Sequence, residues 1–117
     1  ELNNNGDHYR DFTSIKDVLN IFKILIKKRT QNHQIFNICS NRPILVSKLL
    51  KSIEKKMGKI KIKNIKRNSA DVYKTHGNNK KILKFCALKK KDLVNFDIEI
   101  EKLISWYKTI EKQNLFK

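Results

Sequence analysis

Arg10 is the residue with the clearest chemical potential in this sequence. It stands in a short extended run, after an Asn-Gly turn at positions 5–6 and before a helix that begins near Ser14. A guanidinium presents a planar fork of donors that holds a phosphate through two parallel hydrogen bonds, whereas a lysine ammonium is a point charge. The alternative is a surface ion pair with Asp11 or Asp17, which contributes little stability.

A second group of polar residues follows in segment 66–79, which has no apolar period and is expected to be a loop. It contains Arg67 and, four positions later, Asp71. A carboxylate that accepts hydrogen bonds from ribose hydroxyls, close to an arginine on a diphosphate, is chemically sensible. The alternative is a loop whose Ser and Asp side chains bond only to their own backbone. The residues alone leave both open.

The remaining reactive side chains suggest no metal site and no catalytic group. The three histidines have no ligand spacing, and Cys39 and Cys86 are too few and too isolated for a zinc site or a disulfide framework. No Cys–His or Ser–His–Asp arrangement follows from their order. We expect reduced thiols and a cytoplasmic location. No signal peptide is visible, and no apolar run reaches the length of a membrane-spanning helix, so we expect no membrane partner.

The net charge of +16 is the strongest feature of the composition. Such a charge is typical of nucleic-acid-binding proteins, but those usually add arginines and interleaved aromatic side chains. Here lysine supplies most of the charge and is spread over the whole chain, together with abundant Asn and Ile. A solvated lysine coat explains this pattern more simply. A small basic nucleic-acid-binding module stays the alternative function.

The apolar pattern predicts one domain of three to four helices and a few short strands within the 117 residues. Helices are expected at 14–29, at 44–57 with Gly58 as the stop, after Asn79, and from Asp97 onward. Ser14 and Asp17 resemble a capping box for the first of them. The last helix should bury five apolar residues on its inward face, and its Trp106 should pack against the rest of the fold. These five are Ile100, Leu103, Ile104, Tyr107 and Ile110.

Two strands are expected besides the extended run at Arg10. Segment 34–39 carries apolar residues on both faces, which suits a strand buried on both sides of a parallel sheet. Such a strand needs neighbours that this chain barely supplies. Residues 60–63 alternate Ile and Lys, as a half-exposed strand does.

The order of these motifs resembles the C-terminal part of the NAD-dependent nucleotide-sugar epimerases and dehydratases. These are extended short-chain dehydrogenase/reductases, and the UDP-glucuronate and UDP-galactose 4-epimerases are the most similar. The Asn-Asn-Gly turn at 4–6 and Arg-Asp-Phe-Thr-x-Ile-x-Asp at 10–17 resemble the opening of that part. Phe-Asn-Ile-Cys-Ser at 36–40 is similar to the family's Tyr-Asn-Ile-Gly strand and turn. Ala-Asp-Val at 70–72 is similar to Gly-Asp-Val, and Leu-Ile-Ser-Trp-Tyr at 103–107 to Phe-Val-x-Trp-Tyr.

The resemblance implies an α/β fold, α+β as an isolated chain. Residues 1–117 would form the C-terminal substrate-binding segment, without the Rossmann core. It also implies a nucleotide-sugar, most simply a UDP-sugar, as the ligand. Arg10 would bind the diphosphate, Asp71 would lie near the ribose, and Arg67 would be an auxiliary phosphate contact. The family's arginine three residues before the aspartate is replaced here by Asn68.

The family's redox chemistry is not expected from this chain alone. NAD binding needs a glycine-rich turn at a helix N-terminus, and the sequence holds three isolated glycines instead. The general base needs a Tyr-x-x-x-Lys pair, but Thr, Gly and Glu stand four residues after Tyr9, Tyr73 and Tyr107. We therefore expect no catalytic and no cofactor-binding residue, with NAD belonging to the parent family. We also expect self-association through surfaces that the missing domain leaves exposed. The particular sugar, and the choice between epimerisation, dehydration and decarboxylation, stay open.

Overall fold

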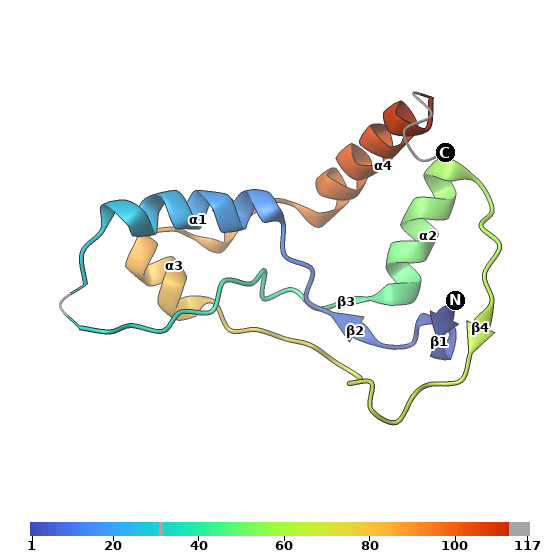
Figure 1. Ribbon diagram of the computed structural model, residues 1–117, viewed down its shortest axis with the longest axis horizontal. Helices are drawn as coiled ribbons and strands as arrows, with labels where there is room; N and C mark the ends of the chain where they lie inside the picture. Colours follow the sequence, from blue (N-terminus) through green and yellow to red (C-terminus); the bar gives the residue numbers. More distant parts are fainter. Residues whose placement is uncertain (31, 113–117) are drawn as a thin grey trace.

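The computed structural model describes residues 1–30 and 32–112, which form four helices and two very short β-ladders (Figure 1). The helices are α1 (Ile15–Lys27), α2 (Val46–Met57), α3 (Lys80–Cys86) and α4 (Phe96–Lys112). The strands are β1 (Leu2–Asn3), β2 (Tyr9–Arg10), β3 (Ile44–Leu45) and β4 (Asn64–Ile65). Single 3₁₀ turns occupy Asn4–Gly6 and Lys90–Asp92. The described chain is therefore α+β, and the α/β alternative is not observed in it.

The two ladders fix the N-terminal segment against the middle of the chain. β1 pairs in parallel with β4, and β2 pairs antiparallel with β3, with Arg10 opposite Ile44. Figure 1 shows β2 and β3 side by side near the centre of the molecule, with segment 66–79 running along its lower edge. Arg10 therefore lies on a paired strand, which holds its backbone in place.

The main apolar cluster joins α1 to α3. Ile21, Ile82 and Cys86 are buried at its centre, and Ile82 has no exposed surface. Phe36 packs against Phe85 with ring centroids 4.9 Å apart, which adds a half-buried aromatic layer. The short helix expected after Asn79 is confirmed, and Asn78 caps it by accepting a hydrogen bond from Lys80 N at 3.0 Å. Together these contacts make α3 the main support of α1.

The helix ends agree with the sequence in part. Gly58 ends α2 with a φ of +87°, as expected, because glycine adopts that conformation without strain. Ser14 caps α1 by accepting from Lys16 N at 3.2 Å. The capping box is wrong, because both carboxylate oxygens of buried Asp17 accept from Val94 N at 3.1 Å instead. This contact ties α1 to the segment before α4.

The cap of α4 and its inward face also differ from the prediction. Asn95, rather than Asp97, caps the helix by accepting from Asp97 N at 2.9 Å. Ile100 and Ile104 are buried as expected, but other residues of the predicted face are exposed. Leu103 is 52% exposed, Trp106 55% and Tyr107 40%. α4 contacts α2, and its Leu103 lines an open hollow shared with the start of α1. In the described residues, no helix has the length and apolar character needed to cross a membrane.

The strands predicted at 34–39 and 60–63 are not formed in the described chain. A strand requires a second strand alongside it, and no described segment pairs with 34–39. Side chains take over part of that role. Lys81 Nζ donates to the Ile35 carbonyl at 3.0 Å, and Asn79 Nδ2 donates to the Cys39 carbonyl at 2.9 Å. The strand that follows α2 begins later than expected, at Asn64.

Candidate functional site

The strand that carries Arg10 holds the 66–79 loop by backbone hydrogen bonds. Tyr9 N donates to Tyr73 O at 2.9 Å, and Thr75 N donates to Tyr9 O at 3.1 Å. These bonds form a parallel bridge between Tyr9 and Lys74. Two segments that lie more than sixty positions apart in the sequence are thereby joined, so the first and second candidate groups meet at one place.

Arg10 forms its ion pair with Asp71, the other predicted ligand residue. Its Nη2 lies 2.6 Å from Asp71 Oδ1, and each side chain is 24% exposed. Its Nη1 donates to the carbonyls of Tyr9 at 2.8 Å and Val72 at 2.9 Å. These bonds use three of the five N–H donors of a guanidinium. The alternative pairing with Asp11 or Asp17 is wrong, because other donors occupy both of those carboxylates.

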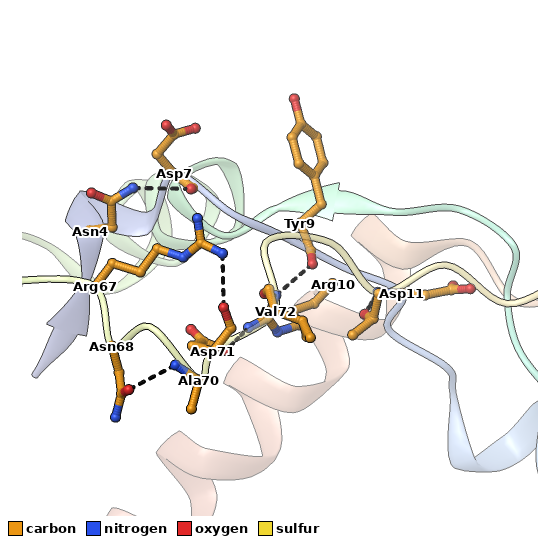
Figure 2. A network of polar contacts seen from close by, with 11 residues as sticks. Asn4, Asp7, Tyr9, Arg10, Asp11, Arg67, Asn68, Ala70, Asp71 and Val72 are labelled. Carbon is orange, nitrogen blue, oxygen red and sulfur yellow. Dashed lines mark hydrogen bonds and ion pairs between the residues drawn. The ribbon is translucent and has the colours of Figure 1, made fainter.

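Arg67 approaches the same aspartate from the other side in the view of Figure 2. Its Nη2 donates to the Asp71 carbonyl at 2.9 Å, and its side chain is exposed. Asn68 closes the loop locally, because its Oδ1 accepts from Ala70 N at 2.9 Å and its carbonyl accepts from Asp71 N at 3.0 Å. The structure thus brings Arg10, Arg67 and Asp71 together, whereas Asn68 stabilises the turn of the loop.

Two tyrosines and a lysine surround this group, and the sequence did not single them out as site residues. The rings of Tyr9 and Tyr73 meet edge to face, with centroids 5.9 Å apart. The Arg67 guanidinium carbon lies 5.6 Å from the centroid of the Tyr73 ring, and Lys74 Nζ lies 5.9 Å from that of Tyr9. The negative charge of Asp7 raises the pKa of the Tyr73 phenol. Sequence reasoning found no interleaving of aromatic and basic residues because this cluster forms only when the two segments pair.

Asp11 anchors the chain directly after Arg10. Its carboxylate accepts from Gly77 N at 2.9 Å, from Asn41 N at 3.1 Å, from Arg42 N at 3.2 Å and from the Ser40 hydroxyl. Burial alone would raise the pKa of this carboxyl, but the hydrogen bonds outweigh that effect and the pKa is lowered. In Figure 2 the side chain points away from Asp71. Asp11 therefore fixes the site's frame and does not belong to its binding surface.

An apolar hollow lies elsewhere, between the start of α1 and α4. It has a volume of about 330 Å³, and Ile15, Phe96 and Leu103 are among its lining residues, whereas Arg10, Arg67 and Asp71 are not. Within the residues that the structure describes, no group of three or more His, Cys, Asp or Glu side chains is placed to hold a metal ion. The cluster around Arg10 is thus an open, cationic and aromatic surface with one carboxylate at its centre.

Comparison of the sequence with models of protein families and with curated proteins found no match.

Proposed function

We propose that this chain binds the nucleotide diphosphate of a nucleotide-sugar, most simply a UDP-sugar. In this proposal it is the substrate-binding segment of an NAD-dependent epimerase or dehydratase. The observation that carries the proposal is the convergence of Arg10, Arg67 and Asp71, which come from two separate segments. Two guanidiniums beside one carboxylate match the opposite requirements of a diphosphate and a ribose.

The geometry supports a different role for each residue. Arg67 is exposed and spends one described hydrogen bond on the protein, so it would reach the phosphates first. Arg10 is held in place by two carbonyls and Asp71, so its remaining donors are already oriented and its side chain would lose little entropy on binding a ligand. Asp71 would accept from a ribose hydroxyl through the lone pairs that Arg10 leaves free. The exposed ring of Tyr73 offers a face for a base.

In this proposal the chain holds substrate and does not transfer hydride. The family reaction oxidises the sugar at C4 with NAD, rotates the keto intermediate and returns the hydride to the other face. In this proposal, residues 1–117 contribute the side chains that bind the diphosphate. Affinity of the chain alone should be weak, because one surface without an enclosing hollow recovers only part of the binding energy.

Titration calorimetry with UDP and UDP-glucuronate tests this proposal. Arg67→Ala should weaken UDP binding about tenfold, the effect of one lost charge-assisted hydrogen bond. Arg29→Ala removes an exposed arginine beyond the end of α1 and serves as the matched control. Equal affinities for the two variants would show that UDP binds the lysine coat without a specific site.

A basic nucleic-acid-binding module is the second candidate, and one structural observation favours it. The cluster of Tyr9, Tyr73, Arg67 and Lys74 combines aromatic faces with cations, as surfaces that bind single strands do. The chain also carries a net charge of +16. Titration of a single-stranded oligonucleotide at rising salt separates the two candidates. A steep salt dependence, with binding stronger than that of UDP, would favour nucleic acid.

A further inference from the structure

Helix α1 has a second apolar face, which no described part of the chain covers. Its buried face, centred on Ile21, packs against α3. Four other apolar side chains of the helix are more than half exposed, and we call them the α1 stripe. They are Ile15 at 69%, Leu19 at 54%, Phe22 at 54% and Ile26 at 78%. At about 100° per residue they fall within roughly 60° of one another, so they form one row along the helix.

The α1 stripe continues onto α4. Ile15 and Leu103 both line the 330 Å³ hollow between the two helices. Leu103 is 52% exposed, and Trp106, one turn later, is 55% exposed. These six side chains, at roughly 100–150 Å² each, expose roughly 700 Å², close to the ~800 Å² that each partner contributes to a standard interface. Patches of this size on a protein surface mark interaction sites.

The spacing of the α1 stripe indicates a helix as its occupant. Its residues follow one another at steps of four, three and four positions, from Ile15 to Ile26. This is the d-a-d-a pattern with which one helix receives the side chains of another along a seam. The hollow beside Ile15 extends the seam and offers space for a larger apolar side chain.

Charge decides which kind of helix fits. The exposed lysines Lys16, Lys23 and Lys27 all lie along one border of the α1 stripe, and the only acidic residue of α1, Asp17, is buried. A second copy of this chain would bring the same lysines and a further net charge of +16. An anionic membrane is a poorer match, because lysines line only one border of the stripe; the opposite border turns inward at the half-buried Val18 and Leu25, and Leu25 packs against the core. A partner with carboxylates along one edge satisfies both features.

We propose that the α1 stripe docks an amphipathic helix of a partner protein, with an apolar face edged by Asp or Glu side chains. The partner's apolar residues enter the seam, and its carboxylates meet the border of Lys16, Lys23 and Lys27. Docking is independent of the proposed nucleotide binding, since Arg10, Arg67 and Asp71 belong neither to the stripe nor to the hollow.

Two labelled synthetic peptides of about three heptads test the proposal by fluorescence anisotropy. Both carry Leu and Ile at the seam positions; one has Glu at its flanking positions and the other has Lys. The acidic peptide should bind with a Kd of about 10–100 µM, and the basic one at least tenfold more weakly. The double substitution Leu19→Gln with Phe22→Gln should weaken binding of the acidic peptide at least tenfold. The control is Ile98→Gln: Ile98 is 50% exposed and lies about 140° around α4 from Leu103, so this substitution should have no effect.

Charge reversal gives a second arm. Lys23→Glu with Lys27→Glu should shift the preference to the basic peptide. Equal binding of both peptides, or no binding of either, would overturn the proposal. Two other results would also overturn it. One is a dimer at low ionic strength that excludes the peptide. The other is binding of the protein to phosphatidylserine vesicles but to neither peptide, with that vesicle binding abolished by Leu19→Gln. UDP affinity should stay the same in Leu19→Gln with Phe22→Gln, so failure of either proposal is recognised separately.

Discussion

Replacement of Asp11 by Asn should destabilise the fold more than the same kind of replacement at any exposed acidic residue. The carboxylate accepts from three backbone N–H groups, at 2.9, 3.1 and 3.2 Å, and from the Ser40 hydroxyl. Hydrogen bonds to a charged group contribute about 1.5–3 kcal/mol each when buried. Asp11 is half-exposed, so solvent reduces that contribution, and asparagine keeps one acceptor. We therefore expect a loss of about 2–3 kcal/mol, which lowers the Tm by about 10 °C.

Thermal and urea unfolding followed by circular dichroism measure this loss. Asp97→Asn, on the exposed first turn of α4, is the matched control and should cost less than about 0.5 kcal/mol. The pH dependence gives an independent check. The pKa of Asp11 lies below its ordinary value of 3.8 in the folded state, so its contribution is present above that value and is lost as the pH falls through the folded pKa. Asp11→Asn should lack this acid-dependent part. Equal stability of the two variants at pH 7 would refute the role of Asp11 as an anchor.

Three further predictions concern a close backbone contact, the phosphate contact of Arg10 and self-association. Gly77→Ala should destabilise the fold by about 2–3 kcal/mol in urea unfolding, because the added Cβ would collide with Cys39 Sγ. Gly58→Ala is the control for the effect of a positive φ alone, since nothing lies within 4 Å of its Cβ position. A smaller loss of stability is expected there. Arg10→Lys should keep the charge but lose the fork, so UDP affinity in calorimetry should fall at least fivefold, and an unchanged affinity would count against a bidentate phosphate contact. Self-association through the exposed apolar faces should be weak at low salt, because the net charge of +16 opposes it, and should increase in light scattering as salt screens that charge. A clean monomer at high protein concentration and high salt would contradict this prediction.

The sequence predicted the local elements well where the determining residues are neighbours. Gly58 ends α2, Ser14 caps α1, and the short α3 follows Asn79, as expected. The capping role of Asp17 was wrong because its carboxylate found Val94, a donor 77 positions away that no local pattern reveals. Segment 34–39 has strand character, yet it forms no strand in the described chain because nothing pairs with it.

The candidate site shows the same division. Arg10 and Asp71 could be singled out by residue type and by resemblance, and the structure places them in contact. The tyrosines that surround them could not be found in the same way, because the pairing of Tyr9 with the 66–79 loop is a tertiary event. Likewise, the apolar period of α1 did not distinguish the face that packs on α3 from the face that stays exposed.

The central claim is that the Arg10–Arg67–Asp71 cluster binds a nucleotide diphosphate, and backbone amide chemical-shift mapping with UDP tests it most directly. We predict that the largest ¹⁵N–¹H shift changes fall on residues 9–11 and 67–74, saturate with UDP, and shrink in Arg67→Ala. Shift changes spread over the lysine-rich faces of α2 and α4, with segments 9–11 and 67–74 unmoved, would contradict the account.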